Sequence, residues 1–340
     1  MNGDRPTRAS TSGRVFLDLR KLARTSGRNA DEILRLYALE GLLARLVISR
    51  PADFALKGDI LLAAYGIRHS ARGIDIQPAH PYADARAVIQ EAAGLDIDDG
   101  LYFGAESATA REVRGDDERK AVRVEVPFEL NTVRATLRAD IAAASPVRPA
   151  SVPVPRVVTV PGLLGRDVVV SGYPLALLYA EKIVTAIDRG PATMRWRDFA
   201  DIYALSALHS ADGSELAAAV RHEAGRRREA GRREVALRPL ADVLGAWVGQ
   251  PRPGWMVWRR KQRLDGVPLQ FPEVLDGVIA FTDPVLDGRA AGAAWRPGRR
   301  LWVADDGACS GNADGDSNSV RGPGGRTLLL GVRPAAPSSP

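Results

Sequence analysis

Several residue types and patterns are scarce in this chain, and each scarcity excludes a class of protein. The 340 residues include one cysteine, Cys309, so neither a disulfide framework nor a cysteine metal cluster can form within the chain. The four histidines, at positions 69, 80, 209 and 222, show no metal-site spacing. No P-loop, nucleophile elbow or zinc motif is present, so the site must use other side chains.

Long apolar runs are missing as well. No stretch of about 18 apolar residues exists, and the opening residues, MNGDRPTRASTSG, lack the apolar core of a signal peptide. We therefore expect no membrane span and a cytoplasmic location. Apolar residues make up 45% of the chain and charged residues 26%, which is typical of a globular protein. The net charge of +6 permits an anionic partner such as RNA or a nucleotide without demanding one.

The apolar periodicity predicts helices, then a mixed region, then helices again. In the first half, helices are expected from Val15 to Ala23, after Asn29 as N-cap, and from Pro81 to Gly94. Alternating or short apolar runs predict strands at 54–56, 74–76, 101–103, 121–128, 134–141 and 168–170. Later helical segments are expected at 175–187, 196–207, 214–248, 255–263 and 271–281.

This order predicts an α/β (α+β) fold, with a mixed sheet core followed by a helical C-terminal domain. We expect a disordered start at 1–12, the core at 13–170, the helical domain at 171–304 and a disordered tail at 305–340. The site is expected in a cleft between the core and the helical domain.

The stretch from Asp53 to Gln77 carries the clearest sign of chemistry. It reads as a strand, a glycine turn at Gly58, a short helix and a strand with Asp75. In nucleotidyl transfer, such a turn holds a triphosphate and strand carboxylates hold magnesium. Asp140 is well placed as a further carboxylate. Position 73, whose side chain would share a strand face with Asp75, is glycine, so the expected carboxylate pair is a single carboxylate.

Four blocks of sequence follow one another between about Glu40 and about Trp302. They are Leu56-Lys57-Gly58-Asp59 with Arg68 and Gly73-Ile74-Asp75; Tyr173-Pro174 with Ala180-Glu181-Lys182 and Ala186; Arg195, Arg197-Asp198-Phe199 and Asp201-Ile202-Tyr203; and Phe281, Asp283-Pro284-Val285 and Trp295. Together these blocks resemble the AbiEii/AbiGii family of nucleotidyltransferase toxins, from bacterial abortive-infection and toxin–antitoxin systems. The resemblance implies a nucleotidyltransferase-like core.

The resemblance also implies an activity, a cofactor and partners. It implies a Mg²⁺-dependent enzyme that moves a nucleotide from a nucleoside triphosphate to an acceptor hydroxyl, with tRNA as an acceptor. It further implies an antitoxin encoded nearby, often a DNA-binding repressor. Asp75 and Asp140 would bind Mg²⁺ and, with Lys182, form the catalytic set. The implied nucleotide-binding residues are Lys57, Gly58, Asp59, Arg68, Lys182, Arg197, Asp198 and Asp201.

Asp198 and Asp201 admit two interpretations, because they lie three residues apart on one helix face. They would orient Lys182 or Arg197, or hold the base or ribose, or they would belong to a salt-bridge network between two helices. Lys182 itself is expected to neutralise phosphate as a point cation.

Two departures from the family pattern bear on activity. Gly73 replaces the first metal-binding aspartate, and Asp59 places a negative charge beside the expected triphosphate. One alternative is therefore a catalytically impaired pseudoenzyme, in which Gly73→Asp would restore the pair and create toxicity.

A second alternative is a nucleic-acid-binding regulator that acts through the arginine run at 226–233. The same run would also suit a solvated helix face. Trp255, Trp258 and Trp295 would either stack bases or belong to the core.

Overall fold

The computed structural model describes residues 6–67, 71–114, 120–143, 154–192, 195–229, 234–247, 249–250 and 252–304. These residues all lie in one unit of the chain, Met1–Asp305. Arg68, Cys309 and the predicted disordered tail at 305–340 lie outside the described residues.

The described residues form helices and strands in the mixed order that the sequence predicts, which confirms the expected α/β class. The helices are α1 Thr11–Thr25, α2 Ala30–Ser49, α3 Gly58–Leu62, α4 Ala85–Ala93, α5 Leu175–Arg189, α6 Trp196–Leu208, α7 Gly213–Glu229, α8 Leu240–Val243, α9 Pro253–Gln262 and α10 Phe271–Leu286. The strands of the large sheet are β1 Phe54–Lys57, β2 Ile74–Pro78, β3 Tyr102–Phe103, β4 Thr109–Arg114, β5 Lys120–Leu130, β6 Val133–Ala142, β7 Arg156–Val160 and β8 Val168–Gly172.

Side-chain caps decide where the first helices begin. Asn29 caps α2 as predicted, since its Oδ1 atom accepts from the backbone N–H groups of Asp31 and Glu32 at 2.8 and 3.2 Å. The prediction that the first helix begins at Val15 is wrong. Helix α1 begins four residues earlier, at Thr11, because Ser10 serves as its N-cap. The helix predicted from Pro81 begins at Ala85, after Asp84 as N-cap. Short polar side chains thus set boundaries that apolar periodicity leaves open.

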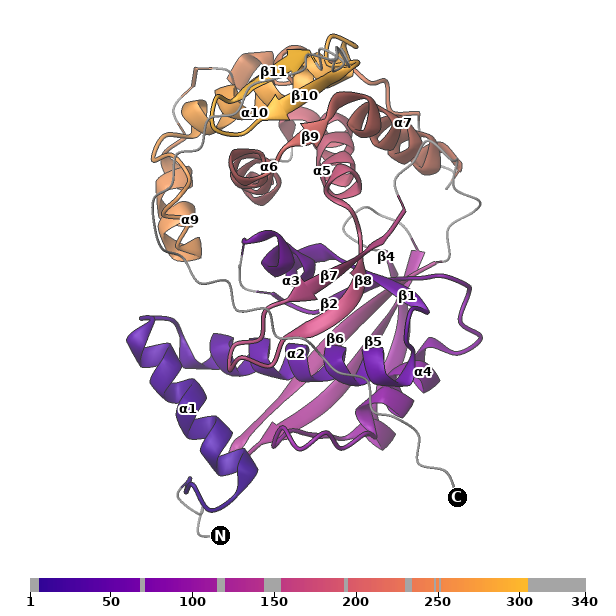
Figure 1. Cartoon of the computed structure of the whole chain (residues 1–340), viewed down its shortest axis with the longest axis vertical. Helices are drawn as coiled ribbons and strands as arrows, with labels where there is room; N and C mark the ends of the chain where they lie inside the picture. Colours follow the sequence, from indigo (N-terminus) through magenta and orange to yellow (C-terminus); the bar gives the residue numbers. More distant parts are fainter. Residues whose placement is uncertain are drawn as a thin grey trace, which may run out of the picture. The chain divides into compact units, whose positions relative to one another are not determined.

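The large sheet is mixed, in the order β3-β5-β6-β2-β1-β8-β7, with β4 paired to β5. The strand β1 pairs antiparallel with β2, and β2 pairs parallel with β6. Helices α2 and α4 lie side by side against this sheet (Figure 1). Because β2 sits between β1 and β6, it brings Asp75 next to both the Gly58 turn and the strand of Asp140.

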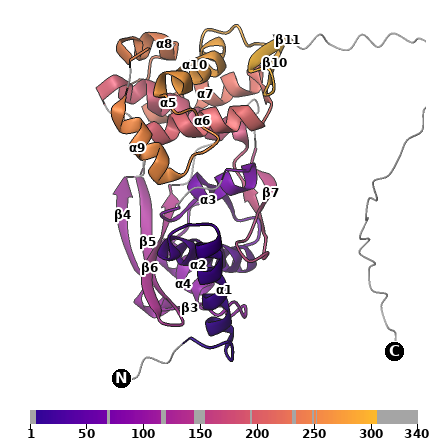
Figure 2. The same cartoon turned by 90° about the vertical axis from the view of Figure 1, so that its left-hand side faces the viewer.

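Helices α5, α6, α7 and α10 follow the sheet and pack together (Figure 2). The expectation of an all-helical C-terminal domain is wrong in one respect. Three short strands, β9 Ala211–Asp212, β10 Ala293–Arg296 and β11 Leu301–Ala304, form a second sheet there. Trp255 and Trp295 are 0% and 1% exposed, so they belong to the core and not to a base-stacking surface.

Part of the arginine run at 226–233 is also buried. Arg227 is 1% exposed, and its guanidinium donates to Asp188 at 3.0 Å, to Thr185 at 2.6 Å and to Glu223 at 3.4 Å. Arg227 therefore joins α7 to α5 and is not part of a solvated or nucleic-acid-binding face, while 230–233 lie outside the described residues. In the part of the chain that the structure describes, no helix is long and apolar enough to cross a membrane.

Candidate active site

A glycine turn at the end of β1 forms one side of the site. Gly58 has a φ of +69°, a left-handed conformation that favours glycine. A Cβ atom at this position would lie 2.8 Å from the Asp75 Cγ atom, so only a residue without a side chain allows this approach. The neighbouring Lys57 donates from Nζ to Glu181 Oε1 on α5, at 3.3 Å. The predicted turn therefore exists, and it touches the predicted strand carboxylate.

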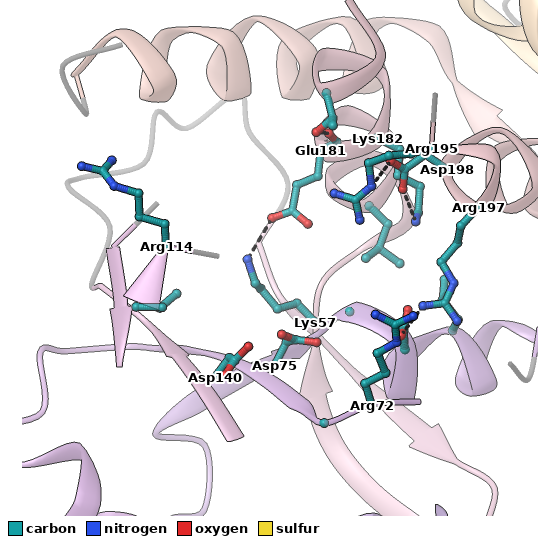
Figure 3. A pocket seen from close by; sticks show the side chains of 18 of the residues that line it. Lys57, Arg72, Asp75, Arg114, Asp140, Glu181, Lys182, Arg195, Arg197 and Asp198 are labelled. Atoms are coloured by element: carbon teal, nitrogen blue, oxygen red, sulfur yellow. Dashed lines mark hydrogen bonds and ion pairs between the residues drawn. The ribbon is translucent and has the colours of Figure 1, made fainter. Parts of the chain in front are cut away.

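Asp75 and Asp140 stand opposite each other on neighbouring strands. The parallel register of β2 and β6 pairs them directly, and Figure 3 shows the two carboxylates side by side. Arg123 on β5 donates from Nε and Nη2 to the two oxygens of Asp140, each at 2.7 Å. The hydrogen bond to Asp140 raises the pKa of Arg123 above its ordinary value. The structure thus brings the two predicted carboxylates together and adds a cation to one of them.

Lys182 on α5 is held by two carboxylates from α6. Its Nζ atom donates to Asp201 Oδ2 at 2.6 Å and to Asp198 Oδ1 at 3.4 Å. Burial by itself would lower the pKa of Lys182, but the carboxylates of Asp201 and Asp198 outweigh burial and raise it. Burial raises the pKa of Asp198, against the opposing effect of Lys182. Asp198 and Asp201 are therefore placed to orient Lys182. The same contacts form a salt-bridge network between α5 and α6, which was the other interpretation of these two residues.

Asp59 is balanced by a cation from the helical part of the chain. Arg197 on α6 donates from Nη1 to Asp59 Oδ2 at 2.7 Å. The negative charge that the sequence analysis placed beside the expected triphosphate is thus compensated. Arg195 pairs in turn with Asp198, at 3.1 Å. Figure 3 shows these arginines on the side of the site that α6 provides.

These groups, apart from the fully buried Asp201, line one cleft of about 810 Å³. Its residues come mainly from β1, β2, β4, β5 and β6 of the sheet and from α3, α5, α6 and α9. Ten lysine or arginine residues line the cleft, against five aspartate or glutamate residues. This excess of positive charge suits an anionic ligand. Trp258 and Trp196 also line the cleft, and their rings pack against each other with centroids 6.0 Å apart.

The chain is similar to a known protein family. A family model described as the nucleotidyl transferase AbiEii toxin of a type IV toxin–antitoxin system matches residues 41–263. Every residue that lines the cleft falls within that match. The chain belongs to the AbiEii nucleotidyltransferase toxin family.

Two solved structures were compared with this AbiEii chain. A crystal structure from H. pylori, described as that of a nucleotidyltransferase, is 14% identical, with a TM-score of 0.36, and covers 63% of this chain and 78% of its own. JHP933 from Helicobacter pylori is 13% identical, with a TM-score of 0.37, and covers 68% and 80%. No curated protein matches this chain.

Two Mg²⁺ ions do not fit the side chains that this AbiEii member provides. Gly73 offers no carboxylate, and both oxygens of Asp140 already accept from Arg123. Within the described ranges, no group of three or more His, Cys, Asp or Glu side chains could hold a metal. A two-metal arrangement, which needs several carboxylates around adjacent ions, is therefore not built by these residues.

Arg123, Arg138 and Trp196 are among the residues of the cleft that escaped the sequence analysis. The signal for Arg123 was available. Asn131 and Thr132 join β5 to β6 as a two-residue turn, with Leu130 opposite Val133. Counting outward from such a turn places residue 123 opposite residue 140. No comparable signal marks Trp196, because its place in the cleft depends on how α6 packs.

Proposed function

We propose that this chain transfers a nucleoside monophosphate from a nucleoside triphosphate to an acceptor hydroxyl within the cleft. The observation that carries the proposal is the contact of the Gly58 turn with Asp75, directly opposite Asp140, inside a cleft with an excess of positive charge. Membership of the AbiEii family supports the same reaction.

In this reaction the acceptor oxygen attacks the α-phosphorus and a new P–O bond forms. The bond to the oxygen that bridges the α- and β-phosphates breaks, and pyrophosphate leaves. Lys182 and Arg197 supply positive charge for the leaving pyrophosphate. The backbone of the Gly58 turn approaches the phosphates, because no side chain keeps them away. Asp140, which Arg123 holds in place, accepts a hydrogen bond from the attacking hydroxyl, whose proton passes to water, and Asp75 faces the phosphates beside it.

Magnesium belongs to this proposal as part of the substrate. A nucleoside triphosphate carries Mg²⁺ on its own phosphate oxygens, so the ion enters with the nucleotide and needs no preformed two-metal site. Asp75 is the carboxylate that such an ion meets in the cleft. Trp196 and Trp258 line the cleft, and we assign the base of the nucleotide to their side of it.

We further propose tRNA as the acceptor and an antitoxin as the binding partner in the cell. The positive lining of the cleft supports an RNA end as acceptor, since phosphate neighbours accompany the reacting hydroxyl. The family description, which names a toxin–antitoxin system, supports the antitoxin. This assignment makes the chain a toxin that modifies RNA.

The test is transfer of α-phosphate label from each of the four nucleoside triphosphates to total tRNA, with Mg²⁺ present. Wild-type protein should label tRNA with at least one nucleotide. Asp75→Asn should reduce labelling by about 100-fold or more, because the Mg²⁺ carried by the nucleotide would lose the carboxylate that it meets in the cleft. Asp31→Asn, at an exposed position of α2, is the matched control and should label as wild type does.

Absence of labelling by the wild type, with every nucleotide and with the protein itself offered as acceptor, would refute the proposed activity. That outcome would favour the pseudoenzyme. Labelling that survives Asp75→Asn would place the chemistry outside this cleft.

A further inference from the structure

The space beside Gly73 is filled by an arginine of the neighbouring strand. The register of β2 and β6, with Ile74 opposite Ala139, puts Gly73 opposite Arg138. A Cβ atom on residue 73 would lie 2.5 Å from Cγ, 3.0 Å from Nε and 2.7 Å from the carbonyl oxygen of Arg138. Gly73→Asp alone therefore does not restore a metal pair, which corrects the expectation from the sequence.

Arg138 carries a buried donor that no acceptor in the described part of the chain satisfies. Its Nε–H group is buried without a hydrogen-bond partner. Glu125, the residue opposite Arg138 on β5, has its ion pair with Arg111, at 3.5 Å. Burying a charged donor without an acceptor is unfavourable. Because Arg138 also lines the cleft, its guanidinium could donate a hydrogen bond to an anionic oxygen of a ligand there.

This arginine reverses the sign of the charge at one point of the cleft. An aspartate at 73 would attract a divalent cation to the side of Asp75, whereas a guanidinium repels cations and attracts phosphate. Arg123 and Lys182 already have carboxylates at hydrogen-bond distance. Arg138 thus adds positive charge next to Asp75, and its forked donors match the oxygens of a phosphate group.

We propose that Arg138 binds the terminal phosphates of a nucleoside triphosphate in the place of a second divalent cation, so that the cleft binds this ligand without any divalent cation. The inference rests on the proposed function, since it takes a triphosphate as the ligand. It separates binding, which the arginines provide, from transfer, in which the Mg²⁺ carried by the nucleotide takes part. It also explains why residue 73 is glycine, since only glycine leaves room for the side chain of Arg138.

The test measures the Kd of inorganic triphosphate, a probe without a base, for the full chain by calorimetry. Binding is compared in EDTA and in excess Mg²⁺, at about 0.15 M salt to suppress weak surface binding. Wild type should bind at least as tightly in EDTA as in Mg²⁺, because Mg²⁺ removes charge from the ligand. Arg138→Gln, which keeps a polar side chain but removes the guanidinium and its charge, should weaken binding in EDTA about tenfold or more.

Arg134→Gln is the matched control. Arg134 lies on the same strand with a side chain that is 78% exposed, and it does not line the cleft. Its Kd should stay within about twofold of wild type. Arg138→Lys keeps a charge and should recover part of the binding. If Arg138→Gln fails to fold, Arg138→Lys and the wild-type comparison in EDTA still decide the question.

Wild-type binding that disappears in EDTA would overturn the inference, as would a folded Arg138→Gln variant that binds like wild type in EDTA. The transfer assay separates this result from the proposed function. Labelling of tRNA together with Mg²⁺-dependent triphosphate binding overturns the role of Arg138 alone. Metal-free binding without any transfer refutes the enzyme activity and leaves the role of Arg138 in place.

Discussion

Replacing Gly73 by alanine should destabilise the protein, although alanine is the better residue for most backbone positions. The added Cβ atom would lie 2.5 Å from Arg138 Cγ and 2.7 Å from the Arg138 carbonyl oxygen. The side chain of Arg138 can turn away, but its carbonyl belongs to β6 and moves only with the strand. Relief therefore requires β2 and β6 to separate locally, at the edge of their hydrogen-bonded register.

The expected size follows from two opposing effects. Overpacking of this kind costs about 1–3 kcal/mol. Alanine recovers about 0.4–1 kcal/mol by reducing the freedom of the unfolded chain. We therefore expect Gly73→Ala to lower the free energy of unfolding by about 1–2 kcal/mol.

Gly225→Ala supplies a control of opposite sign. Gly225 lies within α7, and nothing lies within 4 Å of the Cβ atom that alanine would add. This variant should raise the free energy of unfolding by about 0.5–1 kcal/mol, because glycine is unfavourable inside a helix. Urea titration at equilibrium measures both, with the slope checked for constancy. If Gly73→Ala proves as stable as Gly225→Ala, the close approach of Gly73 to Arg138, and the reasoning built on it, is refuted.

Two further changes probe the cation and the turn of the cleft. Lys182→Met should lower the free energy of unfolding by about 3–5 kcal/mol, because Asp198 and Asp201 stay buried without their cation. Asp201 and Asp198 raise the pKa of Lys182 despite its burial, so its contribution is complete below the ordinary value of 10.5 and is lost as pH rises through the folded-state value. Urea titrations should therefore show a constant difference between wild type and Lys182→Met from about pH 7 to 9 and a smaller one above about 10.5; a difference that grows there would contradict the pairing. Gly58→Ala should cost more than about 1 kcal/mol and abolish triphosphate binding, because a Cβ atom there overlaps Asp75 and the φ of +69° disfavours side chains; unchanged melting and binding would contradict it.

Local patterns in the sequence predicted the parts of the site that depend on local chemistry. The Gly58 turn followed from a break between two apolar runs, and the alternation around Asp75 indicated a strand with one polar face. The sequence also marked Asp140 as a further carboxylate, but its place directly opposite Asp75 comes from the register of β2 and β6.

Contacts that depend on register or packing were out of reach. A side chain at residue 73 would overlap Arg138 only because β2 and β6 are parallel neighbours in the sheet. Nothing in the sequence of residues 54–141 predicts that these two strands pair. The pairing of Arg197 with Asp59 joins residues 138 positions apart. The strands β10 and β11, of four residues each, were also missed, because their pairing with each other and with β9 depends on packing in the helical part of the chain.

The residues that line the cleft come from two parts of the chain that are synthesised one after the other. Asp75 and Asp140 lie on strands that end by Ala142, whereas Lys182 and Arg197 lie on helices that begin at Leu175. A ribosome delivers the sheet first and the helices later. A nascent or prematurely terminated chain that stops before α5 therefore carries the two carboxylates and the arginines of the sheet without Lys182 and Arg197. Such a fragment lacks the helical side of the cleft, which is complete only after translation has passed α9.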